Sequence, residues 1–200
     1  PWASWGGLNE VTSNNQFANG LHNNEYQFGA MGSAVFMQLN ASKLFPQTTL
    51  TVNFSNRNYH QRIAFTHVKP INKNGWSFAH SLSYKLGEGG RWVANSFNGF
   101  AYFLSVDKRL KNQLWSLVLI GNQQVNTRTA AITDELVQLS NSALYQPGWG
   151  LQAGKVRNAN WQFNHQPILI LSHEYQATSQ IKQVSSVLFS SGEKYNTGLD

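Results

Sequence analysis

The sequence contains no cysteine, few charged side chains and no long apolar run. Without cysteine, the 200-residue chain has neither a disulfide scaffold nor a cysteine-ligated zinc site. Charged residues make up 12% of the chain, about half of the share in an ordinary soluble domain. No stretch approaches the ~18 consecutive apolar residues of a transmembrane helix. A surface this poor in charge is unusual for a soluble domain and suits a chain with one face in lipid and another toward a polar interior.

The motifs of nucleic-acid binding, metal binding and catalysis are also missing. The formal net charge is +6, but lysine and arginine are scattered and form no basic run, which disfavours nucleic acid as a partner. The six histidines show neither a His-Glu-x-x-His spacing nor a close triplet with carboxylates. No serine has the Gly-x-Ser-x-Gly setting of a nucleophile. We therefore expect no enzyme activity, no metal and no cofactor.

Residues 75–85 carry the clearest pattern in the chain. Bulky side chains alternate with small or polar ones, which is the period of a β-strand with two different faces. The bulky face has an aromatic residue at each end, Trp76 and Tyr84, and a histidine, His80, in its middle. A strand of a soluble sandwich has a charged face toward water and branched aliphatics toward the core. An apolar face between aromatic girdles, opposite a small polar face, is typical of an outer-membrane barrel strand, although His80 opposes this interpretation.

Six further segments show strand patterns and, together with 75–85, predict an antiparallel meander of seven strands. They are 48–54, 59–67, 100–106, 114–121, 168–175 and 181–190. Short connections at 70–74, 107–112 and 176–180 alternate with longer ones at 86–98 and 122–166. Short turns at one end and long loops at the other are how bacterial barrels are built.

The longest connection contains a predicted helix. Thr133 has the side chain of an N-cap, and Asp134 and Glu135 place acidic groups in the first turn of a helix that runs to residue 140. The alternative for the two carboxylates, a general acid and base pair, lacks any neighbouring catalytic motif.

Several stretches resemble the TonB-dependent outer-membrane receptors, in particular the Bacteroidetes branch related to the SusC-like starch-utilisation transporters. Phe28-Gly-Ala-Met-Gly-Ser-Ala-Val35 resembles the end of that family's plug domain, with Ser33 where a second glycine is usual. Residues 1–2 and 6–12 resemble the preceding plug stretch, and 103–108 and 167–173 resemble barrel strands. The resemblance implies that residues 1–44 are the C-terminal part of a plug-like domain. Residues 45–200 would then be the first seven or so strands of a transmembrane β-barrel, and we expect an internal piece of a longer polypeptide.

The resemblance also implies a function and a location. A protein of this family lies in the bacterial outer membrane and imports a nutrient, such as a glycan, a peptide or a metal chelate. The implied partners are membrane lipid and lipopolysaccharide, the extracellular ligand, a surface lipoprotein lid, and the TonB complex through a segment absent here. The alternative is a soluble, secreted all-β carbohydrate-binding module that uses loop tryptophans.

Candidate ligand contacts lie in the predicted long loops and in the plug-like stretch. Flat aromatic rings beside asparagine and glutamine stack on sugars and other amphipathic ligands, although the same rings also serve to pack loops against one another. Two polar residues of the plug-like stretch are candidates for contact with ligand in the barrel interior. The candidates are His22, Asn23, Trp92, Tyr145, Trp149 and Trp161.

Overall fold

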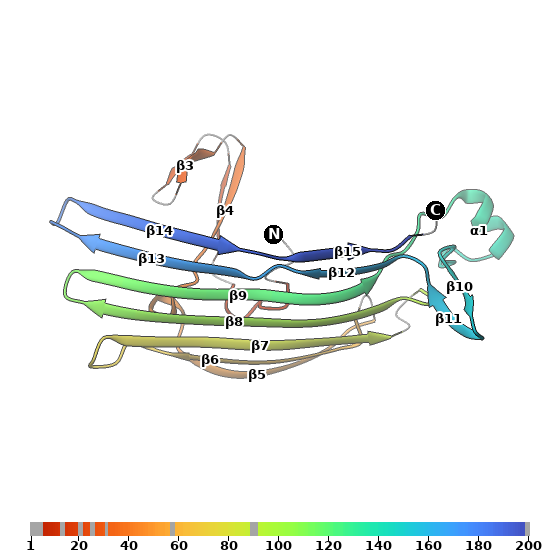
Figure 1. Ribbon diagram of the computed structural model, residues 1–200, viewed down its shortest axis with the longest axis horizontal. Helices are drawn as coiled ribbons and strands as arrows, with labels where there is room; N and C mark the ends of the chain where they lie inside the picture. Colours follow the sequence, from red (N-terminus) through yellow and green to blue (C-terminus); the bar gives the residue numbers. More distant parts are fainter. Residues whose placement is uncertain are drawn as a thin grey trace.

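A single large antiparallel sheet dominates the computed structural model (Figure 1), which describes residues 6–12, 15–19, 22–24, 27–30, 32–56, 59–88 and 92–198. Within these residues, seven strands pair one after another in chain order. They are β5 (Gln47–Phe54), β6 (Gln61–Lys69), β7 (Trp76–Glu88), β8 (Ser96–Leu110), β9 (Gln113–Thr127), β13 (Ile168–Gln176) and β14 (Lys182–Ser190). The predicted all-β antiparallel meander is confirmed, and its seven predicted strands are the seven strands of this path.

Two short strands prolong the sheet beyond β13 and β14. Strand β12 (Trp161–His165) pairs with β9 and with β15 (Glu193–Asn196). The register with β9 is continuous across the break, since Ile168 pairs with Ile120 and His165 pairs with Gln123. β12 and β13 are therefore one line of chain, interrupted at Pro167, which has no backbone N–H to give to the ladder.

The remaining elements are small. The N-terminal part forms two hairpins, β1 (Asn15–Asn19) with β4 (Ser33–Met37) and β2 (His22–Asn24) with β3 (Gln27–Ala30), and then the 3-10 helix η1 (Ala41–Lys43). The connection from β9 to β12 holds the helix α1 (Asp134–Ser140) and a hairpin of β10 (Trp149–Gln152) with β11 (Lys155–Asn158). No helix in the described ranges is long and apolar enough to cross a membrane.

The predicted α-helix is confirmed, and it begins after Thr133 as the sequence predicts. The backbone N–H of Leu136 donates to the Thr133 hydroxyl at 3.4 Å, which is the expected N-cap. The helix ends at Ser140 because Asn141 adopts a left-handed conformation with φ 50°.

Three predicted connections are wrong in extent because strands continue through them. β7 reaches Glu88 and β8 begins at Ser96, so strand residues occupy both ends of the predicted loop 86–98. β8 and β9 are joined by residues 111–112 alone, not by 107–112. β9 extends to Thr127, well into the predicted connection 122–166. Polar residues at these strand ends interrupt the alternation of bulky and small side chains on which the prediction relied. The strands continue because the hydrogen bonds between their backbones do not depend on side-chain type.

The two faces of the sheet differ sharply in side-chain size and exposure. We call the face with Trp76, Phe78, Leu82, Leu104 and Leu117 the open face, because these side chains are 39–47% exposed. The opposite face, which we call the covered face, carries many small or polar residues with exposures of 0–2%, beside the larger core residues Val68, Phe103, Val118 and Ile120. The small or polar residues on the central strands include Thr66, Ser77, Ala79, Ser81, Ser83, Ala101, Ser105 and Ser116.

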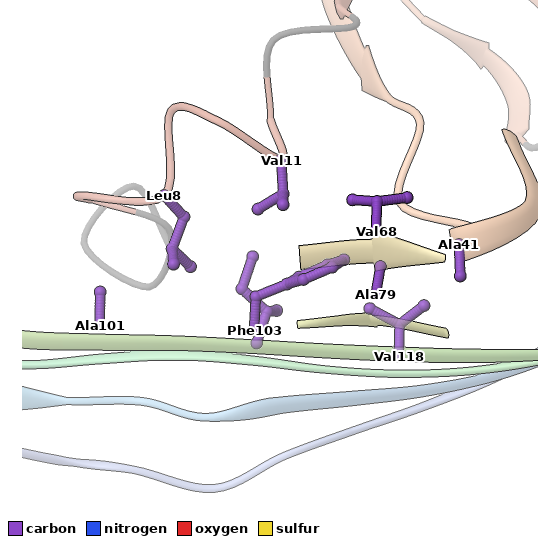
Figure 2. Close-up of a cluster of buried hydrophobic side chains, with 9 residues drawn as sticks. Leu8, Val11, Ala41, Val68, Ala79, Ala101, Phe103 and Val118 are labelled. Atoms are coloured by element: carbon purple, nitrogen blue, oxygen red, sulfur yellow. The ribbon is translucent and has the colours of Figure 1, made fainter. Parts of the chain in front are cut away.

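Residues 6–12 and 38–43 lie over the covered face and make the apolar core with it. Figure 2 shows Leu8 and Val11 directed at the sheet, where they meet Phe103. Ala41 joins the same cluster, together with Val68, Ala79, Ala101 and Val118 from the strands. The core of the described residues therefore forms between the sheet and the segment that precedes it.

The connections between the strands alternate between the two ends of the sheet. The β6–β7, β8–β9 and β13–β14 connections, residues 70–75, 111–112 and 177–181, all lie at one end. Residues 55–56, 59–60, 92–95 and the long stretch that contains α1, β10 and β11 lie at the other end (Figure 1). We call these the turn end and the loop end. The long connection between β9 and β12 lies at the loop end, as predicted, whereas the connection between β7 and β8 is hardly longer than that between β6 and β7.

We expect Gly75→Ala to destabilise the turn end by about 2 kcal/mol, because Gly75 has φ 78° and a Cβ there would run into the Arg109 carbonyl. Gly150→Ala is the matched control, since a Cβ at Gly150 meets no atom within 4 Å. Urea unfolding followed by circular dichroism measures both variants. Equal midpoints for the two would contradict the close approach of the β6–β7 turn to β8.

Candidate functional site

The most deeply buried cation of the covered face is Arg62 of β6, which is 2% exposed. Its guanidinium makes a two-pronged ion pair with Glu10, with Nη1 at 2.9 Å from Oε1 and Nη2 at 2.6 Å from Oε2. Nη2 also donates to the Gly7 carbonyl at 2.7 Å, and Nε donates to the Ser83 hydroxyl at 3.0 Å. The segment 6–12 is thus joined to β6 and β7 through a single arginine.

A buried guanidinium is costly to desolvate, so its partners decide whether it stabilises the fold. Burial by itself raises the pKa of the Glu10 carboxyl, but the hydrogen bonds and charge of Arg62 outweigh burial and leave that pKa below its ordinary value. The carboxylate is therefore charged at neutral pH and the pair is intact. Lys85 lies beside it, with its Nζ 5.2 Å from the centre of the Tyr59 ring.

Residues 38–43 are joined to the next strands by hydrogen bonds to small polar side chains. The Ala41 N–H donates to Ser105 Oγ at 2.9 Å, and the Ser42 N–H donates to Asp107 Oδ2 at 2.7 Å. Asn40 Nδ2 donates to Ser116 Oγ at 2.7 Å. Backbone amides come this close only because the strand side chains beneath them are short, which gives the serines of the covered face a physical role.

The long loops at the loop end are organised by buried side-chain amides. Gln146 is fully buried and accepts from the N–H groups of Ala130 and Gly148 while it donates to the Arg128 carbonyl. Asn158 donates to the Arg128 carbonyl and to the side chain of Asn95, both at 3.2 Å. The 92–95 connection and the 128–160 stretch are therefore joined into one polar platform.

The candidate ligand residues are distributed over different surfaces. Trp92, Tyr145 and Trp149 belong to the loop-end connections, as expected, and Trp149 begins β10 opposite Asn158. Trp161 is not in a loop but in β12, where its ring stacks on Phe163 at 6.4 Å between centroids.

The two plug-like candidates lie in β2, and their side chains are outside what the structure describes. His22 is paired through its backbone with Ala30 of β3. No group of three or more histidine, aspartate, glutamate or cysteine residues gathers as a metal site in the described ranges. Trp92, Tyr145 and Trp149 thus share the loop end of the sheet.

Comparison with known proteins adds no relative, since no protein-family model, curated protein or solved structure matches the chain. The resemblance to TonB-dependent receptors therefore rests on the residues quoted above alone.

Sequence reasoning missed the Arg62–Glu10 pair, whose members are 52 positions apart. A signal was present, because an arginine at position 62 falls on the small-residue side of a strand whose other side is Ile63 and Phe65. Its partner could not be identified without knowing which segment covers that face.

We expect Glu10→Ala to release residues 6–12 from the sheet, because it leaves a buried arginine without its carboxylate, a loss of about 3 kcal/mol or more. Hydrogen exchange at the amides of 6–12 measures the release. The double variant Glu10→Ala/Arg62→Met removes both charges and should retain more protection than Glu10→Ala alone. Equal exchange in the two variants would show that the ion pair does not hold the segment.

Proposed function

We propose that this chain is part of the wall of a TonB-dependent outer-membrane transporter, with the inner segment that occupies its interior, and that the transporter imports a nutrient. The observation that carries the proposal is the exposed bulky face of the sheet, which lies opposite a buried face of mostly small side chains around the apolar cluster at Phe103. A soluble sandwich buries its bulky face instead. An exposed apolar surface of this extent needs an apolar environment, and lipid supplies one without a second protein layer.

The open face is bordered at the turn end by residues that suit a lipid–water interface. Lys108 Nζ lies 4.6 Å above the Trp76 ring and donates to the Asn74 carbonyl at 2.8 Å. Trp115 stacks on His173 with 4.1 Å between ring centroids. Aromatic rings with a polar tip and lysines with a long apolar stem are the residues enriched at such borders.

The apolar band also runs obliquely across the strands. On β5 the band covers 50–54, and the strand pairing places these residues level with 82–86 of β7. On β14 it covers 187–189, and the pairing places these level with 78–80 of β7. The band therefore shifts by about five residues, roughly 17 Å, over six strand spacings of about 4.8 Å. That shift corresponds to strands inclined by roughly 30°, close to the ~35–45° of membrane barrels.

His80, which opposed the membrane interpretation, lies beside a polar group of the neighbouring strands. Its ring is 5.5 Å from that of His67, which shares a 2.8 Å hydrogen bond with the hydroxyl of Thr48. Because the apolar band is oblique, the row of Thr48, His67 and His80 forms the turn-end border of the band on β5 and β6. His80 therefore adjoins polar neighbours on one side and the apolar band on the other.

The sheet does not close on itself within the described residues, and its path ends at β5 on one side and β14 on the other. The smallest bacterial barrels have about eight strands, and unpaired edges invite association with other strands. The proposal therefore includes further strands that complete the wall. In the completed barrel the covered face lines the interior, where residues 6–12 and 38–43 already lie.

Spin labels along β13 test whether the open face contacts lipid. Because the chain has no native cysteine, each single-cysteine variant carries its label at one position. We expect labels at Leu169→Cys and Leu171→Cys, on the open face, to be relaxed by oxygen dissolved in lipid after reconstitution into vesicles. The control Ser172→Cys, on the covered face, should respond to a water-soluble nickel chelate. A response to nickel at all three positions would favour the soluble carbohydrate-binding module.

Import is tested in cells that make the intact protein, with labelled glycans, peptides and metal chelates as candidate nutrients. Since uptake in this family is driven by energy relayed from the inner membrane, we expect a protonophore to abolish accumulation of the transported nutrient but not its binding at the cell surface. Accumulation that continues after the protonophore would contradict a TonB-dependent mechanism, even where the spin labels confirm the membrane wall.

A further inference from the structure

A shallow pocket of about 240 Å³ opens at the turn end of the sheet, between η1, the β8–β9 turn and the start of β14. Its lining is strongly cationic. Among the described residues that form it, four cations face one carboxylate, which leaves a formal net charge of +3. The charged lining residues are Lys43, Arg109, Lys111, Lys182 and Glu174.

The carboxylate does not neutralise the whole pocket. Glu174 Oε1 lies 2.8 Å from Lys43 Nζ, and its Oε2 lies 3.3 Å from Lys182 Nζ, so each oxygen already serves one lysine. Arg109 and Lys111 come from the neighbouring strand end and turn, and both side chains are exposed. Glu174 forms its ion pairs with the two lysines, so it does not offset the positive charges of Arg109 and Lys111.

The walls of the pocket are held in place by the backbone. Asn112 and Gln176 are joined by two hydrogen bonds, from the Gln176 N–H to the Asn112 carbonyl and from Asn112 Nδ2 to the Gln176 carbonyl, both at 2.9 Å. Lys111 sits in the two-residue turn with φ 34°, so its position is set by a tight turn. A site whose groups are positioned before binding loses less entropy when a ligand arrives.

We propose that this pocket binds a small polyvalent anion, a phosphate group or a di- or tricarboxylate. Guanidinium and ammonium groups bind both through charge-assisted hydrogen bonds. The volume is below the ~300–1,000 Å³ of sites for drug-sized ligands, which favours a small anion. The inference goes beyond the proposed transport function and does not depend on it, because the pocket and its charges exist whether the open face meets lipid or not.

Calorimetric titration of the detergent-solubilised protein at low salt, with inorganic phosphate in one arm and citrate in the other, tests the site and distinguishes the two anion classes. We expect saturable binding of at least one of them. Arg109→Gln should weaken it by about fivefold, the upper range for one exposed charge pair. Lys73→Gln, the matched control, removes a lysine from the β6–β7 turn at the same end of the sheet and should leave binding unchanged.

We expect Glu174→Gln to change the anion affinity in the opposite direction to Arg109→Gln. It removes the negative charge of the pocket and releases two lysines toward the anion, so the affinity should rise. The absence of saturable heat with both phosphate and citrate would overturn the proposal. Weaker anion binding by Glu174→Gln would also overturn it, as would an equal loss of affinity in Arg109→Gln and Lys73→Gln. Circular dichroism of each variant confirms that the compared proteins share one fold.

Discussion

The structure depends on the way side-chain size is divided between the two faces of the sheet. Short side chains on the covered face let the backbone of the preceding segment approach within hydrogen-bonding distance, as the contact of Ala41 with Ser105 shows. A leucine or phenylalanine at such a position would separate the two layers by several ångströms. Because strands alternate, the bulky residues must then occupy the other face, and no described segment covers them.

Arg62 is the most deeply buried cation of the covered face, and it is tolerated because its guanidinium is held by specific hydrogen bonds. Two oxygens of Glu10, one backbone carbonyl and one serine hydroxyl surround the guanidinium. Replacing such a group by an apolar one is often neutral, whereas removing a single partner is severe. The pair therefore fixes where residues 6–12 lie more than it contributes net stability.

The period of two was sufficient to predict the seven strands of the meander, their order and the end of the sheet at which each connection lies. It failed at strand ends such as 96–99 and 122–127, where glycine, asparagine and glutamine interrupt the alternation while the backbone ladder continues. It also placed Trp161 in a loop, since Pro167 hides the continuity of β12 with β13. The buried amide of Gln146 left no sequence signal, because a glutamine among turn residues is ordinarily exposed.

The inner segment is attached to the covered face in two places by different interactions. Leu8 and Val11 fill the space above Phe103, and the Arg62–Glu10 pair lies on the loop-end side of this cluster. On its turn-end side, residues 38–43 are held by hydrogen bonds to Ser105 and Asp107. Because the two attachments share no residue, loss of the ion pair releases 6–12 and leaves 38–43 bound to the sheet.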